Sequence, residues 1–321
     1  MLFRTIFSRL TAYLKLLKNL FVWSLCVFLI LGLPILCLAQ ELEPRRWSHL
    51  PTGTNFLGGG YAYTEANILF DPVLRIEDAE MEMHTWSVKF IRTFELFQKS
   101  ARIDLTQAYQ EGRWTGLLNG APASIKRRGL SDSILRFAIN LYGAPPLEGK
   151  EFAAYRAKVD VETIFGTALV VHLPTGDYMN DKLINLGTNR FTFRPQLGVV
   201  HNRGKWSFEL TGAVWLYTDN NDFFNGSKLE QDPYFTAQTH LIYSFRPGLW
   251  ASASAGYGDG GKSTINGVEK NDRKKNLAWA FSFGFPITRQ LGVKVAYLAT
   301  RTQESIGQDS DSIGAAFSIF W

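Results

Sequence analysis

The last thirteen residues, DSDSIGAAFSIFW (residues 309–321), decide the fold class of this 321-residue chain. From Ile313 onward, apolar and aromatic residues alternate with small or polar ones, and the chain ends on the aromatic Trp321. Alternation with a period of two indicates a β-strand with one apolar face and one small or polar face. An apolar outer face and a polar inner face are typical of a lipid-embedded β-barrel, although a soluble β-sandwich gives similar alternation.

Residues 1–39 have the layout of a secretory signal peptide. They carry four basic residues and no acidic one, followed by an apolar run over residues 20–33 and by small residues near Ala39. This order of segments predicts cleavage after Ala39, so that the mature chain covers residues 40–321. An uncleaved membrane anchor is the alternative, but Pro34 and a preceding glycine leave no uninterrupted apolar span of about 20 residues.

The composition of the mature chain excludes several function classes. Both cysteines, Cys26 and Cys37, lie in the expected signal peptide, so we expect no disulfide, no thiol nucleophile and no cysteine metal site. The whole chain has 34 basic and 29 acidic residues, and loss of the four basic residues of the leader brings the net charge to about +1. Nucleic acid is therefore not an expected partner.

The mature chain consists of stretches of about ten residues in which apolar and polar or small residues alternate, as in an outer-membrane β-barrel. Phe165, Phe191, Phe281 and Phe317 share the apolar parity, and we expect them to face lipid. The sequence predicts an all-β transmembrane antiparallel barrel of twelve strands, at residues 55–69, 81–94, 100–110, 131–142, 158–173, 188–201, 205–217, 234–245, 249–258, 275–285, 290–301 and 311–321.

The lengths of the connections favour the barrel over the sandwich. Even-numbered connections such as 202–204 and 286–289 are short, whereas odd-numbered ones such as 111–130 and 218–233 are long and polar. Short turns at the periplasmic end and long loops at the extracellular end are the pattern of outer-membrane barrels. The connection 143–157 is the exception, and its residues 149–156 predict a short periplasmic helix.

Charged residues on the inward parity define the expected functional surface, which is the lumen. Fixed charges that line a narrow pore bias which ions enter it. Arg190 and Arg194 lie four residues apart with the same parity, and Gln196 follows them, so we expect them to form a constriction. The full set of lumen candidates is Arg190, Arg194, Gln196, Arg136, Lys89, Asp160, Glu162, Glu209 and His240, and paired charges that merely satisfy one another are the alternative for each.

A series of short motifs resembles a known family. They include LPTGTNF at residues 50–56, PTGDY at 174–178 and NLGTNR at 185–190. In this order and spacing they resemble the proteins of the MetA-pathway of phenol degradation, over about residues 47–321. The resemblance implies an outer-membrane barrel that takes up aromatic or other hydrophobic compounds, and it assigns no catalytic residue.

Two functions of different classes remain open at this point. One is an outer-membrane channel for small, hydrophobic or aromatic solutes. The other is a barrel without transport, either an enzyme of the lipase or protease kind or a structural surface protein. The five histidines show no metal-ligand spacing, so we expect no metal and no cofactor. The Asp- and Asn-rich stretch 219–222 predicts turn chemistry, with calcium binding as the alternative.

The expected partners follow from this organisation. They are the lipid bilayer and lipopolysaccharide around the barrel, and a small-molecule solute in the lumen. The C-terminal aromatic Trp321 predicts recognition by the barrel-assembly machinery and anchoring of the last strand at the periplasmic membrane interface.

Overall fold

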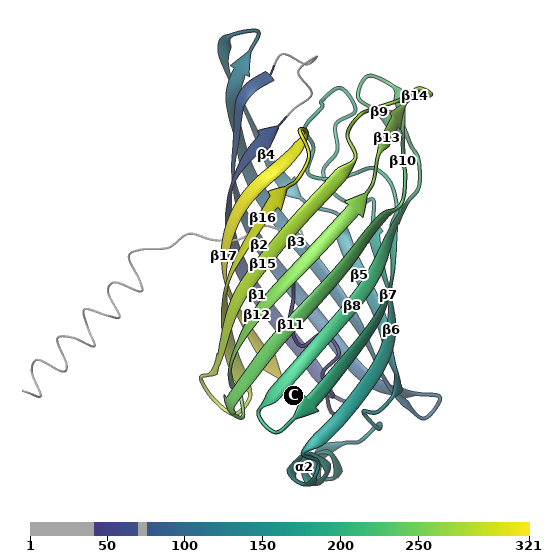
Figure 1. The fold of residues 1–321 in the computed structure, drawn as a ribbon, viewed down its shortest axis with the longest axis vertical. Coiled ribbons are helices and arrows are strands. Elements are labelled where there is room, and N and C mark those ends of the chain that lie inside the picture. Colours follow the sequence, from purple (N-terminus) through teal and green to yellow (C-terminus); the bar gives the residue numbers. More distant parts are fainter. Residues whose placement is uncertain (1–41, 70–75) are drawn as a thin grey trace, which may run out of the picture. The chain divides into compact units, whose positions relative to one another are not determined.

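The computed structural model describes residues 42–69 and 76–321, so the expected signal peptide with Cys26 and Cys37 lies outside the described residues. These residues form a closed antiparallel β-barrel with tilted strands (Figure 1). The only helix of the described residues is α2 (Gly149–Lys158), which agrees with the short helix expected at residues 149–156. No helix of the described residues is long and apolar enough to cross a membrane.

Twelve strands make the ring, and each pairs with its neighbours in the chain. The first strand, β1, pairs antiparallel with the last, β17, from Phe56 opposite Phe320 to Leu69 opposite Gly307, which closes the sheet. The predicted number of strands is therefore confirmed. The ring strands are β1 (Asn55–Leu69), β2 (Ile76–Leu96), β3 (Lys99–Leu118), β5 (Ser133–Tyr142), β6 (Val161–Leu173), β7 (Thr192–Arg203), β8 (Trp206–Tyr217), β11 (Tyr234–Arg246), β12 (Leu249–Gly260), β15 (Lys274–Pro286), β16 (Leu291–Thr302) and β17 (Gly307–Phe320).

The alternation in each strand gives the barrel an apolar outside and a polar inside. The four phenylalanines expected on the lipid side are exposed, with 39% for Phe165, 42% for Phe191, 59% for Phe281 and 52% for Phe317. Inward neighbours such as Ser282 and Ser312 are buried at 6% and 3%. Successive side chains of a strand point to opposite faces. The register of each strand therefore determines which of its residues face lipid and which face the lumen.

The long loops contain more β-structure than the sequence pattern predicted. Part of the expected loop 111–130 is a hairpin, because β3 continues to Leu118 and pairs with β4 (Ala121–Leu130). The loops 218–233 and 259–274 contribute a second small sheet of β9 (Asn220–Phe223), β10 (Ser227–Gln231), β13 (Ser263–Ile265) and β14 (Val268–Glu269).

Three Asn-Gly turns account for these extra hairpins. Asn119 and Gly120 have φ values of 52° and 77°, Asn225 and Gly226 have 58° and 77°, and Asn266 and Gly267 have 50° and 77°. Positive φ at both central residues is what a type I′ hairpin turn needs, and Asn-Gly is the pair that adopts it most readily.

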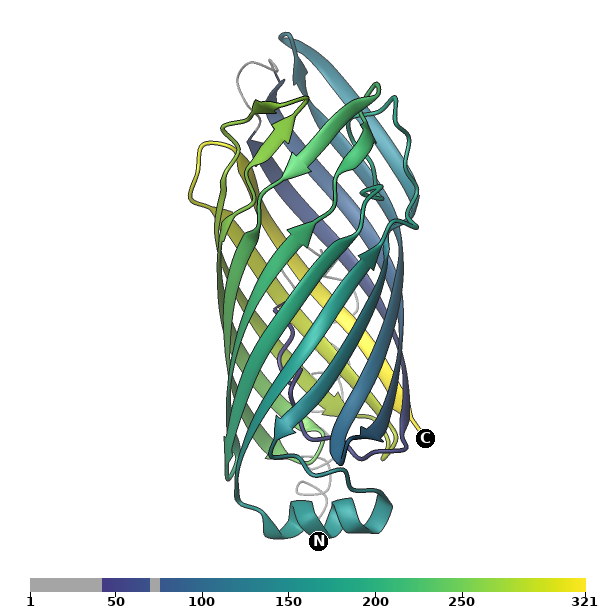
Figure 2. The same ribbon diagram turned by 90° about the vertical axis from the view of Figure 1, so that its right-hand side faces the viewer.

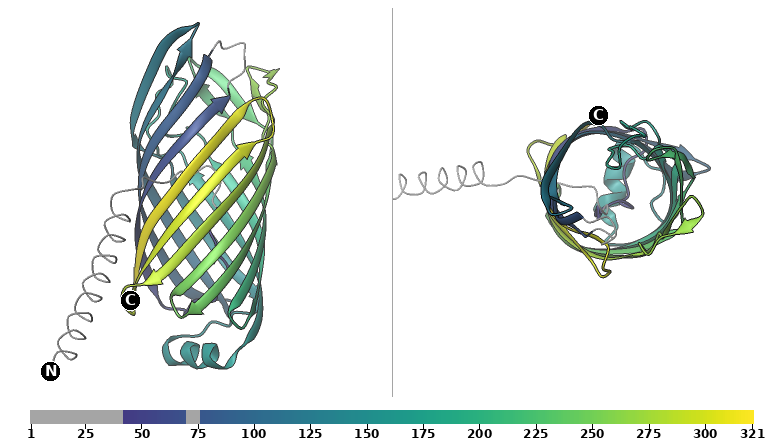
Figure 3. Two further views of the ribbon diagram at one scale, coloured as in Figure 1. Left: turned by 60° about the vertical axis from the view of Figure 1, so that its left-hand side comes forward. Right: turned by 90° about the horizontal axis from the view of Figure 1, so that it is seen from above.

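A segment of the chain lies inside the barrel. Residues 42–54, which we call the plug segment, run through the lumen to the periplasmic end, where β1 begins (Figure 2). Seen along the barrel, the plug segment lies within the ring of strands (Figure 3). The sequence pattern did not predict this arrangement, because residues 42–54 show neither strand nor helix periodicity.

The lipid-facing surface supports a prediction about stability. Replacing Phe281 with Arg puts a charge in the hydrocarbon layer and is expected to destabilise the barrel by about 2–4 kcal/mol. The matched control is Val268→Arg, because Val268 is 58% exposed but belongs to the small extracellular sheet. Urea unfolding in lipid vesicles measures both, and equal effects of the two substitutions would contradict a membrane position for Phe281.

Candidate functional site

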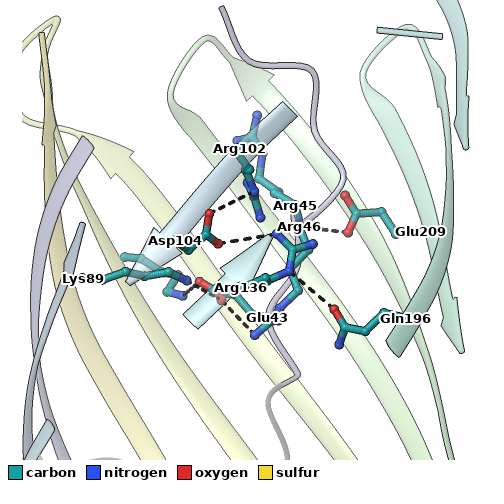
Figure 4. Close-up of polar contacts among 10 residues, drawn as sticks. Glu43, Arg45, Arg46, Lys89, Arg102, Asp104, Arg136, Gln196 and Glu209 are labelled. Carbon is teal, nitrogen blue, oxygen red and sulfur yellow. Dashed lines mark hydrogen bonds and ion pairs between the residues drawn. The ribbon is translucent and has the colours of Figure 1, made fainter. Parts of the chain in front are cut away.

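The plug segment binds the lumen wall through Glu43, which forms ion pairs with two strands. Its carboxylate lies 3.2 Å from Nζ of Lys89 on β2 and 3.7 Å from Nζ of Lys294 on β16. The guanidinium of Arg46, in the plug segment itself, lies 3.2 Å from the same carboxylate. Figure 4 shows Glu43 and Lys89 in this arrangement. A lumen carboxylate with three cations around it retains its charge in spite of burial.

Arg45 makes the second set of contacts. Its backbone N–H donates to Oε2 of Glu209 on β8 at 2.9 Å (Figure 4). Its guanidinium carbon lies 5.3 Å from the ring centroid of Trp250 on β12, within the range of a cation–π interaction. Glu209 is 1% exposed, so this hydrogen bond gives a partner to one oxygen of a carboxylate that water does not reach.

Trp47 is the most deeply buried side chain of the plug segment, at 1% exposure. Its indole Nε1 donates to Oγ1 of Thr211 at 2.8 Å, and the guanidinium carbon of Arg136 lies 5.1 Å from its ring centroid. The ring lies against Gly166 of β6 and Gly198 of β7. The cavity left beside Trp47 measures about 20 Å³, which is room for roughly one water molecule.

His49 links the plug segment to α2 at the periplasmic end. Its Nε2 is 2.8 Å from the carbonyl oxygen of Pro145, and its Nδ1 is 3.3 Å from Oε1 of Glu162. The rings of Phe152 and Tyr155, both in α2, approach the imidazole edge-on with centroids at 4.9 and 5.2 Å. The predicted periplasmic helix therefore contacts the segment that enters the lumen.

Glu162 accepts hydrogen bonds from the polar groups around this contact. Its carboxylate accepts hydrogen bonds from the hydroxyl of Tyr155 at 3.0 Å, from Arg156 at 2.6 Å and from Nδ2 of Asn202 at 3.3 Å. Burial raises the pKa of the Tyr155 phenol, and the hydrogen bond to Glu162 raises it further. The phenol thus keeps its proton and remains a donor to the carboxylate.

A smaller group of charges lies on the neighbouring strands β3 and β5. Asp104 is 3.3 Å from Nε of Arg102 on the same strand and 3.5 Å from a terminal nitrogen of Arg136 on β5. The side-chain oxygen of Gln196 accepts from Nε of Arg136 at 3.4 Å. Figure 4 shows these residues gathered around the plug segment.

Arg190 and Arg194 do lie on the inward side, but each is stacked on an aromatic ring of β8. The guanidinium carbon of Arg190 is 4.6 Å from the ring centroid of Tyr217, and that of Arg194 is 4.2 Å from the ring centroid of Trp215. Arg190 precedes β7 at the extracellular end and also bonds to Gln231. Arg194 is 1% exposed, so of the two only Arg190 offers its charge to a passing solute.

Most of the other lumen candidates gather around the plug segment. Lys89, Arg136, Glu162, Gln196 and Glu209 contact it directly or contact one of its partners. Asp160 was wrongly expected in the lumen, because it lies before β6 in the periplasmic turn, where it is exposed and its carbonyl accepts from Gly204. Asp160 is two residues before the inward-facing Glu162, but β6 begins only at Val161, one residue after Asp160.

His240 is buried on the inner face of β11 beside a serine. Its Nδ1 is 2.8 Å from Oγ of Ser254 on β12, and Glu209 is its direct neighbour across the β8–β11 ladder. Serine, histidine and a carboxylate in one row are the residue types of a hydrolase. The Glu209 carboxylate, however, accepts from the Arg45 backbone. In the described residues, no group of three or more His, Cys, Asp or Glu is placed to hold a metal ion.

The sequence reasoning missed the plug residues Leu42, Glu43, Arg45, Trp47 and His49. Their charges were available as a signal, since the stretch EPRRW combines a carboxylate, two arginines and an indole shortly before the first strand. No periodicity assigns such a stretch to a wall, and its partners lie up to 251 residues away in the chain.

Asp132 joins the two motifs PTGDY and NLGTNR. Its buried carboxylate accepts from the backbone N–H of Gly176 at 2.9 Å and from the N–H and hydroxyl of Thr188 at 3.0 and 2.6 Å. Gly176 and Gly187 approach so closely that a Cβ on either would lie 2.7 Å from the backbone of the other. PTGDY and NLGTNR are therefore loop architecture.

The Asp- and Asn-rich stretch 219–222 also serves the loops. Nδ2 of Asn220, which is 1% exposed, donates to the Tyr178 hydroxyl at 3.0 Å and to the Thr188 carbonyl at 3.2 Å. Asp222 accepts from Asn180 at 2.9 Å, and Asp219 pairs with Lys228 at 2.7 Å. These contacts tie the stretch to the loop of residues 174–191 and to β10, so it joins two loops and is not only a local turn.

One side of the extracellular end of the lumen is apolar. Ala66, Met81 and Met83 are buried on the inner face of β1 and β2, and Ile68, Trp114 and Leu186 pack against them. Methionine side chains are flexible and polarisable, and they adapt to apolar surfaces of different shapes. We call these six residues the apolar vestibule.

A closed antiparallel ring with an apolar outside and a polar inside defines a transmembrane β-barrel. The chain belongs to the family described as "Putative MetA-pathway of phenol degradation", whose model matches residues 52–308. The resemblance seen in the short motifs is thereby confirmed.

A solved structure shows the same fold, and others resemble the chain less. The COG4313 outer membrane channel from Pseudomonas putida F1 is similar with a TM-score of 0.72 at 19% identity, over 88% of this chain and 100% of that one. The β domain of the Bordetella autotransporter BrkA gives 0.45 at 8% identity, over 84% and 100%. OpdK of Pseudomonas aeruginosa with vanillate gives 0.34 at 12% identity, over 84% and 98%. No curated protein matches the chain.

The Asp132 network yields a prediction for the loops. Asp132→Ala leaves the donors on Gly176 and Thr188 without their acceptor and is expected to speed protease cleavage within residues 174–191 by about tenfold, as for a local loss of about 1.4 kcal/mol. Asp181→Ala is the control in the same loop, because the Asp181 side chain is 60% exposed and pairs only with Lys182. Limited proteolysis of the folded barrel makes the measurement, and equal rates for both variants would remove Asp132 from this role.

Proposed function

We propose that the protein is an outer-membrane channel for small hydrophobic or aromatic solutes and that the plug segment is its gate. The observation that carries the proposal is the filling of the lumen by a segment of the chain. Residues 42–54 occupy the lumen and hold to the wall by ion pairs and hydrogen bonds that can open without unfolding the ring.

The size of the ring supports this proposal. Barrels of eight strands are nearly filled by their own side chains, whereas rings of sixteen strands leave an aqueous channel. A ring of twelve strands encloses a space between these two cases, and here the chain fills it with a separate segment. Removal of that segment leaves a passage through the ring. A barrel with a purely structural role would not need a filling that can be removed.

The apolar vestibule supports the choice of solute. Met81 and Met83 precede Lys89 on β2, so the apolar vestibule lies nearer the extracellular end than the charges around Glu43. Apolar and aromatic compounds gain free energy at such a surface, whereas ions do not. His240 and Ser254 lie on the inner face of the ring, and the neighbouring Glu209 carboxylate accepts from the Arg45 backbone, an arrangement that supports holding the plug segment as the role of this carboxylate.

The surroundings of the barrel belong to the same proposal. The exposed outer wall faces the bilayer and lipopolysaccharide of the outer membrane. Trp321 is 58% exposed and exchanges backbone hydrogen bonds with Asn55 at 3.0 and 3.1 Å, so the last residue completes the final rung between β17 and β1. An exposed aromatic at this seam is what the barrel-assembly machinery would recognise.

The gate can be tested by its removal. Deletion of residues 42–50 is expected to raise the single-channel conductance in planar bilayers several-fold, because it removes the contacts of Glu43, Arg45 and Trp47 together. Glu43→Gln weakens only the ion pairs and is expected to open the channel for part of the time. The matched control is Glu269→Gln, because Glu269 forms an exposed ion pair with Lys262 outside the lumen. A deletion variant that conducts no better than the wild type would refute the gate.

The two arginines are expected to differ in their effect on ion selectivity. Arg190→Gln should lower the anion-over-cation permeability ratio, since its partly exposed charge lies at the extracellular end of the lumen. Arg194→Gln should leave the ratio unchanged, because Arg194 is buried against Trp215. Reversal potentials under a salt gradient measure the ratio, and a larger effect at Arg194 would contradict the assignment.

A further inference from the structure

The wall beneath Trp47 lacks side chains at two adjacent positions. Gly166 of β6 and Gly198 of β7 are directly opposite each other in the ladder, and both face the lumen. A Cβ on Gly166 would lie 2.6 Å from the Trp47 ring, and one on Gly198 would lie 2.0 Å from it. Glycine inside a strand weakens the strand and marks a close approach of another group. The two glycines together form a flat floor.

The edge of this floor carries a hydrogen-bond acceptor. Thr211 of β8 is the ladder neighbour of Gly198, and its hydroxyl accepts from the indole Nε1 at 2.8 Å. Thr211 is 4% exposed, so water does not compete for this position. A planar ring with an N–H or O–H on its rim satisfies the hydroxyl, and a purely hydrocarbon ring does not.

The remaining sides select for an aromatic ring. The Arg136 guanidinium lies 5.1 Å from the ring centroid, where it favours the negative face of a π-system. Ala138, Ile164, Ala168 and Val200 form the buried apolar cluster around the indole. We call the site made by Gly166, Gly198, Thr211 and Arg136 the aromatic slot.

A second indole in the lumen shows why the aromatic slot differs from ordinary packing. Trp250 lies in the same way over Gly284, where a Cβ would be 2.2 Å from its Nε1. Trp250, however, belongs to β12 of the wall and stays with its glycine whatever the plug segment does. Trp47 belongs to the plug segment, so the aromatic slot becomes empty when the segment leaves.

We propose that the aromatic slot is the binding subsite of the channel for small planar aromatic solutes that carry an N–H or O–H donor, such as indoles and phenols, and that Trp47 occupies it as an internal substitute. The proposal rests on the proposed function and names the solute class for the same lumen. A solute of this class displaces Trp47 and takes over its contacts with Thr211 and Arg136. Binding of the solute and release of the plug segment are then competing events at one site.

The test uses the full mature protein in detergent micelles and isothermal titration with four probes. Phenol and indole have a ring and a donor, toluene has a ring without a donor, and cyclohexanol has a donor without an aromatic ring. Trp47→Ala empties the aromatic slot, and it is expected to bind phenol and indole at least about tenfold more tightly than the wild type does. Toluene should bind about tenfold more weakly than phenol, and cyclohexanol should show no gain over the wild type.

Two further substitutions in the Trp47→Ala background assign the site. Thr211→Val removes the acceptor at nearly constant volume, so it should abolish the preference for phenol over toluene. Gly198→Ala places a methyl group where the ring lay and should abolish the binding of both. Gly284→Ala is the matched control at the other flattened position, and it should leave phenol binding unchanged.

The outcomes separate this proposal from the channel. Equal binding of phenol and cyclohexanol to Trp47→Ala, or binding that survives Gly198→Ala, overturns the aromatic slot. If Trp47→Ala does not fold, the same titration on the protein lacking residues 42–50 decides the question, because that variant also empties the site. Since titration does not require conduction, phenol binding in a barrel that never conducts supports the slot and refutes the channel, and conduction without phenol binding does the reverse.

Discussion

The backbone must satisfy its own hydrogen bonds in a bilayer, and the rest of this structure follows from that requirement. No water is available in the hydrocarbon layer, so a sheet with a free edge cannot span it and the ring has to close. Closure between β1 and β17 leaves an interior that the chain must fill with something other than lipid. Twelve strands enclose more space than the inward side chains fill, and the plug segment fills it.

The lumen charges depend on the plug segment for their partners. Glu43 pairs with Lys89 and Lys294, which lie on opposite sides of the closure seam, and the Arg45 backbone donates to one oxygen of Glu209. Several arginines stack on aromatic rings, as Arg194 does on Trp215. A guanidinium is weakly hydrated and planar, so a ring face compensates part of the cost of its burial.

The wall was predictable from the sequence because its signal is local. Each strand carries its own alternation, and the segment 55–69 was placed at the observed limits of β1. The three additional hairpins could also have been predicted, because each contains an Asn-Gly turn signal. These signals, at Asn119-Gly120, Asn225-Gly226 and Asn266-Gly267, lie in polar stretches that were expected to be loops. Asp160 shows what alternation cannot predict. The pattern tells which face of a strand a residue would occupy, but it does not tell where the strand begins or ends.

The lumen residues were predictable as a set, but their arrangement was not. Lys89, Glu162 and Glu209 were assigned to the lumen by parity, which says nothing about height along the barrel or about a partner from outside the wall. Trp47 had no pattern to identify it, because its site is made of two glycines whose significance appears only when a ring lies over them. Contacts of this kind follow from tertiary structure alone.

The plug segment touches the barrel around most of its circumference. Glu43 reaches β2 and β16, Arg45 reaches β8 and β12, and Trp47 lies against β6, β7 and β8. A ring with one strand fewer, or with one ladder shifted, cannot present all these partners at the required positions. The binding site of the plug segment therefore forms only when the barrel has closed. The plug segment, which comes first in the described chain, is accordingly the last part that can fold into position.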